Sequence, residues 1–100
     1  MSDRKLRFTS EARGDFRSII RYGRATWGER CKDAYAAQLN VAFQSLTAFP
    51  NLGRNRDDVS PGPRSFPAEE HVVYYRVGPR SITIIRILHA TMDAIRQFDR

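Results

Sequence analysis

The sequence predicts an α+β fold in which a helical hairpin lies across one face of a largely antiparallel sheet. Three patterns support this prediction: a strand-like alternation near the start, two consecutive helical stretches, and two late runs of β-branched and aromatic residues. A chain of 100 residues has room for one hydrophobic core. We therefore expect a single domain over residues 1–100.

The first element is expected to be a strand over residues 5–9, because Leu6 and Phe8 alternate with polar side chains. A helix should follow with Ser10 as its N-cap. It should end near Gly28, since glycine adopts the left-handed conformation that closes helices. Its apolar face is predicted to consist of Ala12, Phe16, Ile19, Ile20, Gly23 and Trp27.

A second helix is expected over residues 29–49, and Pro50 should stop it. Its predicted apolar stripe consists of Tyr35, Leu39, Ala42, Phe43, Leu46 and Phe49. Between Asp33 and Arg54 no side chain is charged, so the outer face of this helix has unusually little charge. We therefore expect part of that face to be covered. A short turn between the two helices makes them an antiparallel hairpin.

The second half of the chain predicts the remaining strands. Residues 51–67 are rich in Pro, Gly, Asn and Asp, which indicates a loop leading into a short strand near residues 64–66. Residues 71–77 and 81–89 should form a β-hairpin, because both runs are dense in β-branched and aromatic residues. Thr91 is expected to cap a short terminal helix. The predicted order is thus strand, two helices, three strands and a short helix.

Composition narrows the class of protein. A formal charge of +6 and a pI of about 10.2 favour polyanions or an acidic protein as partners. Cys31 is the only cysteine, which excludes an internal disulfide and fits a reducing compartment. The charged stretch of residues 1–8 is typical of neither a signal peptide nor an anchor, and no apolar run has the length of a membrane helix. We therefore expect a cytoplasmic protein without a membrane partner.

The arginines of the first helix, Arg13, Arg17, Arg21 and Arg24, resemble a nucleic-acid footprint. Asp15 interrupts the series, however, and no aromatic platform accompanies it. A solvated helix face is the simpler interpretation.

Enzyme signatures are missing from the sequence. The histidines His71 and His89 have no recognisable nucleophile partner, and no phosphate-binding glycine motif occurs. Glu69, Glu70 and His71 do not form a compact metal site, because adjacent residues of a strand point to opposite faces. We expect neither a cofactor nor a metal.

Arg86 is the most informative charged residue, because it interrupts an apolar run that should form an inner strand. A charge at such a position needs a partner or must reach the edge of the sheet. Two interpretations remain open. Arg86 forms an internal ion pair, with Asp93, Glu69 or Glu70 as the candidate acids, or it contacts a target.

Several phrases together resemble ParE-type toxins of the ParE/RelE superfamily, from Leu6 onward. The helical hairpin carries Trp27-Gly28, Ala34-Tyr35 and Leu39, followed by the Pro-x-x-Gly-Arg loop of Pro50-Asn51-Leu52-Gly53-Arg54. The final strands carry the runs of residues 71–77 and 85–89, followed by Met92-Asp93. The resemblance also fits the predicted order of elements.

The resemblance implies the toxin of a type II toxin–antitoxin pair, of the kind that stabilises plasmids and arrests growth. A cognate antitoxin encoded beside it would wrap the toxin with an extended, partly helical C-terminal segment. Operator DNA would be reached only indirectly, through the antitoxin. The residues expected to contact the antitoxin are Arg17, Arg21, Tyr35, Leu39, Phe43, Tyr74 and Arg76.

The family divides by target: ParE-like members poison DNA gyrase, whereas RelE-like members cut ribosome-bound mRNA. RNA-cutting members use basic side chains and often a tyrosine near the end of the last strand or in the terminal helix, and residues 89–100 contain neither tyrosine nor lysine. We therefore expect a gyrase inhibitor without bond chemistry of its own. The expected target contacts are Arg86, His89, Met92, Asp93, Arg96, Arg54, Arg56 and Arg64.

Two alternatives remain. An mRNA endonuclease would use Arg86 and His89 as its catalytic groups. A non-toxic member would bind its partner only.

Overall fold

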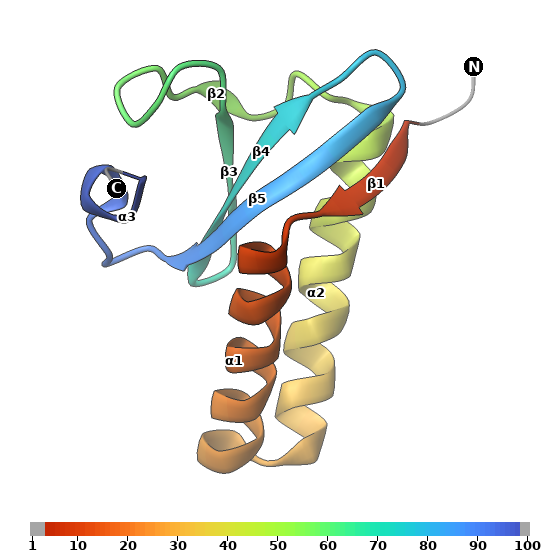
Figure 1. Ribbon diagram of the computed structural model, residues 1–100. Helices are drawn as coiled ribbons and strands as arrows, with labels where there is room; N and C mark the ends of the chain where they lie inside the picture. Colours follow the sequence, from red (N-terminus) through yellow and green to blue (C-terminus); the bar gives the residue numbers. More distant parts are fainter. Residues whose placement is uncertain (1–3, 99–100) are drawn as a thin grey trace.

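Two antiparallel helices cover one face of a five-stranded sheet (Figure 1). The computed structural model describes residues 4–98. Its elements are β1 (Lys5–Phe8), α1 (Ser10–Trp27), α2 (Glu29–Ala48), β2 (Arg54–Asn55), β3 (Arg64–Ala68), β4 (His71–Val77), β5 (Ser81–His89) and α3 (Ala94–Phe98). The predicted α+β fold is confirmed: a strand, a helical hairpin, and a sheet that ends in a short helix.

The strands lie in the order β1-β5-β4-β3-β2. β1 runs parallel to β5, with Lys5 opposite Ser81, and the other pairs are antiparallel. β2 was not predicted, because two residues are too short to show an alternating pattern. β3 extends past the predicted residues 64–66 and includes Pro67, a position where β2 no longer pairs with it and a missing N–H is tolerated.

α1 begins one residue earlier than predicted, at Ser10 itself. Thr9, not Ser10, is the N-cap, since its backbone is extended and its hydroxyl accepts the N–H of Ala12 at 3.0 Å. The backbone N–H of Thr9 also donates to the carbonyl of Ile84, so the cap is held by β5. The predicted end is confirmed: α1 stops at Trp27, and Gly28 has a φ of 90°.

α3 also begins differently from the prediction. Its first turn is capped by Asp93, whose carboxylate accepts the N–H of Ile95 at 3.1 Å. Thr91 instead bonds to His89. Asp93 directly precedes α3, whereas Thr91 lies three residues before it. The side chain of Asp93 can therefore bond to an N–H of the first turn, and Asp93 is the cap.

The main core lies between the hairpin and the sheet. Ala12, Leu39 and Leu46 of the helices pack against Val73 and Tyr75 of β4 and against Ile82, Ile84 and Ile87 of β5. The predicted helix faces are therefore correct over most of their length. At their far ends they are wrong, because Trp27 is 48% exposed and Phe49 is 65% exposed. Figure 1 shows why for Trp27, since the hairpin extends well beyond the end of the sheet.

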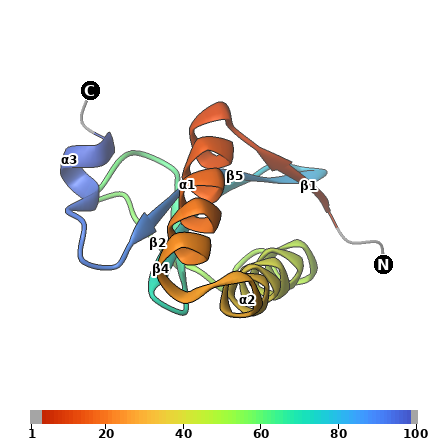
Figure 2. The same ribbon diagram turned by 90° about the horizontal axis from the view of Figure 1, so that it is seen from below.

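A smaller cluster lies on the opposite face of the sheet. Alternation along β4 turns Tyr74 to this side, where its ring packs edge-on against Phe98 of α3 at a centroid distance of 5.2 Å. Leu88 and Ala94 complete the contact. Figure 2 shows the result, with α1 between α2 and α3 when the molecule is seen from below.

Within residues 4–98 no helix is both long enough and apolar enough to cross a bilayer.

Candidate functional site

The start of α1 is fastened to β5 just beyond the end of β1. The register places Tyr74 opposite Arg86 and Tyr75 opposite Ile84, which leaves Ile85 as a bulge. The hydroxyl of Thr9 donates to the carbonyl of Ile85 at 2.9 Å. The carboxylate of Asp15 accepts the N–H of Ile87 at 2.9 Å. Side chains of the helix thus satisfy backbone groups that β1 no longer reaches.

Arg86 is held by the same carboxylate. Its Nε lies 2.8 Å and its Nη2 lies 3.1 Å from the two oxygens of Asp15, and both side chains are about four-fifths buried. The hydrogen bond to Asp15 raises the pKa of Arg86. The prediction of an internal ion pair is confirmed, but the acids named for it were wrong.

Asp15 is the residue from which the partner of Arg86 could have been predicted. It is the acid that interrupts the arginine series of the first helix. An acid at this position lies on the flank of α1 that passes the bulge of β5, where Arg86 needs a partner.

The other predicted target residues at the C-terminal end of the chain lie at the end of β5 and around α3. His89, Met92 and Arg96 are exposed. Asp93 is exposed as well, although its carboxylate caps α3. Arg86 lines a recess with Gln97 and Phe98 of α3, but its guanidinium is bound to Asp15.

Two of the three predicted loop arginines have structural partners. Arg56 pairs with Asp58, with Nε to Oδ1 at 3.0 Å, and its guanidinium lies over the ring of Tyr74. Arg64 donates to the carbonyl of Gly53 at 2.7 Å. Arg54 remains exposed on β2.

The residues predicted to contact the antitoxin divide by accessibility. Leu39 and Tyr74 are buried and fill the two clusters, so they offer no surface in this structure. Arg17 and Arg21 are exposed on α1. Two further predicted residues have other surroundings: Arg76 donates to the carbonyl of Pro61 at 2.8 Å, and Phe43 is buried but reached through a pocket described below.

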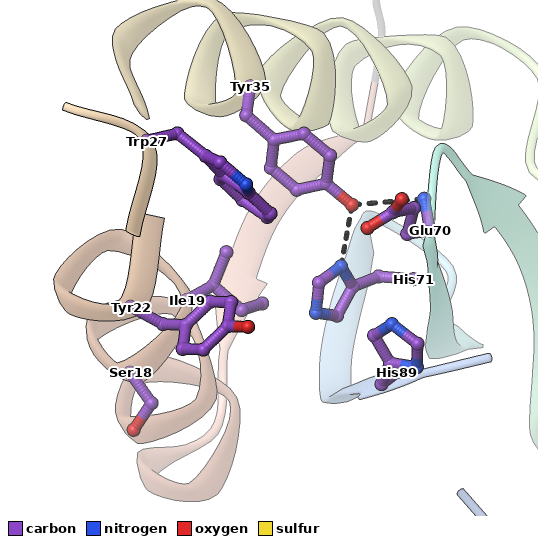
Figure 3. A pocket seen from close by; sticks show the side chains of 8 residues that line it. All are labelled: Ser18, Ile19, Tyr22, Trp27, Tyr35, Glu70, His71 and His89. Atoms are coloured by element: carbon purple, nitrogen blue, oxygen red, sulfur yellow. Dashed lines mark hydrogen bonds between the residues drawn. The ribbon is translucent and has the colours of Figure 1, made fainter. Parts of the chain in front are cut away.

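A first pocket of about 330 Å³ lies between the hairpin and the end of the sheet. Figure 3 shows Trp27 and Tyr22 on one side of it, with Tyr35, His71 and His89 on the other. We call it the imidazole pocket, and its lining residues are Ser18, Ile19, Tyr22, Trp27, Tyr35, Glu70, His71 and His89. The sequence did not predict it, because it joins residues of four elements.

Tyr35 connects His71 to the turn before β4. The phenol oxygen accepts the N–H of Glu70 at 3.0 Å and lies 2.6 Å from Nδ1 of His71. The phenol can donate its own proton to Nδ1 when the imidazole carries its proton on Nε2. Burial, reinforced by His89, lowers the pKa of His71, and burial raises the pKa of Tyr35. Both groups are therefore neutral at pH 7, and the phenol is not prepared as a nucleophile.

A second pocket of about 340 Å³ lies between β1 and the two long helices. We call it the edge pocket, and its lining residues are Leu6, Phe8, Arg13, Phe16, Arg17, Asn40 and Phe43. Its floor is aromatic, since Phe43 contacts Phe8 at 5.2 Å and Phe16 at 6.3 Å between ring centroids. Arg13 and Arg17 are exposed at its rim. An apolar recess with a cationic rim suits an acidic, amphipathic partner.

Among the described residues 4–98, no group of three or more His, Cys, Asp or Glu side chains is placed to hold a metal ion. Two pairs of partly buried polar side chains bond to each other instead: Arg86 with Asp15, and His71 with Tyr35. Fold and site together define a small α+β domain whose surface offers two pockets and several exposed arginines for contact with other molecules.

Comparisons with known proteins identify the family. The profile of the family described as "ParE toxin of type II toxin-antitoxin system, parDE" matches residues 6–94. The Toxin ParE1 of Caulobacter vibrioides is 33% identical over 88 residues, which cover 88% of this chain and 91% of that protein. The chain therefore belongs to the ParE toxin family of type II toxin–antitoxin systems, and the predicted resemblance is confirmed.

Two solved structures share the fold. A chain of the chromosomal ParDE system from P. aeruginosa has a TM-score of 0.74 at 23% identity, and the match covers 86% of this chain and 95% of that one. A chain of the toxin–antitoxin complex RelBE2 from Mycobacterium tuberculosis has a TM-score of 0.63 at 24% identity, and the match covers 88% and 99%.

Proposed function

We propose that this toxin inhibits DNA gyrase and that a cognate antitoxin neutralises it. The ion pair of Arg86 with Asp15 is the observation that favours gyrase over mRNA as the target. A nuclease that stabilises a phosphorane-like transition state needs free cations aimed at the scissile phosphate. Here the cation best placed for that role is already neutralised by a carboxylate.

The chemistry available beside Arg86 supports the same choice. After β5 the sequence offers no tyrosine or lysine as a general base or acid. His89 is exposed, but its Nδ1 is 2.8 Å from the hydroxyl of Thr91 and accepts that residue's N–H at 3.2 Å. One imidazole beside an arginine that is already paired with a carboxylate is a weak basis for RNA cleavage.

An antitoxin as partner is supported by the edge pocket and by the structural neighbours. The pocket combines an aromatic floor with Arg13 and Arg17, which matches an acidic amphipathic segment. The two neighbours of similar fold come from a ParDE toxin–antitoxin system and from a toxin–antitoxin complex.

For the gyrase contact we propose the surface formed by the end of β5, α3 and the loop before β3. Val59 of that loop and Phe98 of α3 pack in the same small cluster, so the loop and the helix lie on one face of the sheet. Arg54 and Arg96 are exposed cations of this face. His89, Met92 and Asp93 complete the proposed surface.

The test compares two activities of the purified toxin, with and without the cognate antitoxin. One assay measures DNA supercoiling by gyrase, and the other measures ribosome-dependent cleavage of mRNA. We expect inhibited supercoiling that the antitoxin reverses, and intact mRNA. Cut mRNA with unaffected gyrase would replace this proposal with the endonuclease, and no effect in either assay would indicate a partner-binding member.

A pair of variants tests the surface itself. Arg96→Glu should weaken gyrase inhibition at least tenfold, because it reverses a charge within the proposed contact. Arg30→Glu is the matched control, since Arg30 is also exposed but lies at the tip of the hairpin. Equal inhibition by the two variants would place the gyrase contact elsewhere.

A further inference from the structure

The imidazole pocket is walled mainly by aromatic rings. Figure 3 shows Tyr22 and Trp27 on one side of it and Tyr35, His71 and His89 on the other. Tyr22 and Trp27 stand at 89° to each other, with their ring centroids 5.5 Å apart. Tyr35 meets His71 at 5.6 Å and His71 meets His89 at 5.3 Å, again edge to face. Tyr and Trp rings set in this way form the corners of a cage, and their π faces attract cations.

Two of these rings are exposed although they are large. Tyr22 is 62% exposed and Trp27 is 48% exposed. Neither belongs to the two core clusters, so packing of the core does not explain their position. Large apolar rings that are exposed together beside a recess are typical of a binding surface.

The local charge of the pocket is opposite in sign to that of the chain. The chain carries a formal charge of +6, yet Glu70 is the only Asp, Glu, Lys or Arg among the 8 residues that line the pocket. Among the described residues no salt bridge involves Glu70. His71 does not oppose this charge, because burial and His89 lower its pKa and leave it neutral at pH 7. Burial raises the pKa of Tyr35, and Glu70 and Glu69 raise it further, so their negative field reaches the pocket.

Size and charge together select the class of ligand. A volume of about 330 Å³ lies at the lower end of the range for small-molecule sites. An anion would be repelled by Glu70 and would meet neither lysine nor arginine among the lining side chains. A small organic cation finds both a carboxylate and the π faces of the rings, which is how proteins recognise alkylated ammonium groups.

We propose that the imidazole pocket binds a small organic cation of the alkylammonium class, held between the rings of Tyr22, Trp27 and Tyr35. The alkyl groups on its nitrogen contact the rings, and the carboxylate of Glu70 balances its charge. The ligand bridges the helical hairpin and the end of the sheet, so its binding stabilises the folded chain. This inference does not depend on whether the toxin acts on gyrase or binds an antitoxin.

Tryptophan fluorescence of the purified toxin tests the site directly, because Trp27 is the only tryptophan of the chain. Choline is the probe, and its uncharged isostere, in which a carbon atom replaces the nitrogen, is the control. Sodium chloride keeps the ionic strength constant. We expect a saturable change with choline, at an affinity about fivefold higher than that of the isostere. Equal affinities would show a merely apolar recess and would overturn the inference, as would the lack of saturation with choline.

Three variants test the residues. Glu70→Gln should weaken choline binding about threefold and leave the isostere unaffected, because only the charge is removed. Glu11→Gln is the matched control, since it removes the same charge from an exposed residue outside the pocket and should leave binding unchanged. Tyr22→Leu keeps an apolar wall but loses the π face, so it should also weaken choline binding about threefold. Equal effects of Glu70→Gln and Glu11→Gln would mean that choline senses only the net charge, against the proposed site.

Thermal unfolding provides a readout that is independent of fluorescence. Choline should raise the melting temperature of the wild type more than that of Glu70→Gln or Tyr22→Leu, because a ligand of the folded state stabilises it in proportion to its affinity. The isostere should have a smaller effect on the wild type. An equal rise in all three proteins would assign the effect of choline to the bulk solution and would contradict a specific site.

Discussion

Arg86 of β5 and Asp15 of α1 form a two-point ion pair at the place where β1 ends and β5 continues beside β4. The same carboxylate accepts the N–H of Ile87, so it serves a charge and a backbone group together. Removing only one of the two side chains lowers the stability of the fold, because the other is left with a partly buried, uncompensated charge.

We therefore expect Arg86→Ala and Asp15→Ala each to lower the free energy of unfolding by about 2 kcal/mol. The double variant should lose clearly less than the sum of the two, since the second change removes the group that the first left unpaired. Urea denaturation of the four proteins of this cycle measures the coupling. Strictly additive losses would show that the two side chains do not stabilise each other.

This pair also explains which parts of the fold could be predicted from the sequence. Leu6 and Phe8 alternate within four residues, and the apolar residues of the two helices recur within one or two turns. Such local periodicity reflects which side of an element is buried, so elements and core could be predicted. Arg86 and Asp15 are 71 positions apart, and their contact depends on how α1 lies against β5.

The candidate site was less predictable for the same reason. The imidazole pocket and the edge pocket each combine side chains of separate elements, and the spacing of residues in the sequence does not show which elements will meet.

Thr9 and Ser10 show a second limit of prediction from the sequence. Both are good caps, and the choice between them is made by a hydrogen bond to Ile84 on a distant strand.

Gly53 of the Pro-x-x-Gly-Arg loop is required because there is no space for a side chain. A Cβ there would lie 2.6 Å from the hydroxyl of Tyr75 and 2.7 Å from the carbonyl of Ser65. Tyr75 cannot move away, since it is fully buried and its hydroxyl bonds to both Gly53 and Pro50. Gly53→Ala should lower the free energy of unfolding by about 2–3 kcal/mol.

Gly14→Ala is the matched control for this prediction. Gly14 lies inside α1, and a Cβ there would meet nothing within 4 Å. Alanine is the better helix former, so this variant should gain about 0.5–1 kcal/mol. Chemical denaturation of both variants checks the opposite signs, and similar effects of the two substitutions would contradict the steric explanation.

Glu69 stores strain in the turn between β3 and β4, because it is a non-glycine residue with a φ of 58°. Glu69→Gly should raise the free energy of unfolding by about 0.5–1 kcal/mol through relief of that strain. The same change at Glu70, which has no positive φ, should lower stability instead. Thermal unfolding of the two variants provides the comparison, and a loss of stability in Glu69→Gly would show that its conformation carries no cost.

His71 should make the stability of this toxin depend on pH. Burial, together with His89, lowers its pKa below the ordinary value of 6.5, so the unfolded chain takes up this proton at a higher pH than the folded one. Stability is then complete above about pH 6.5 and falls as the pH drops through the folded pKa. Protonation also ends the acceptance of the Tyr35 hydroxyl by Nδ1. Urea denaturation from pH 7.5 to pH 5 should show this loss in the wild type and in His89→Gln, whereas His71→Gln should flatten the profile. An unchanged profile in His71→Gln would assign the acid sensitivity to the carboxylates.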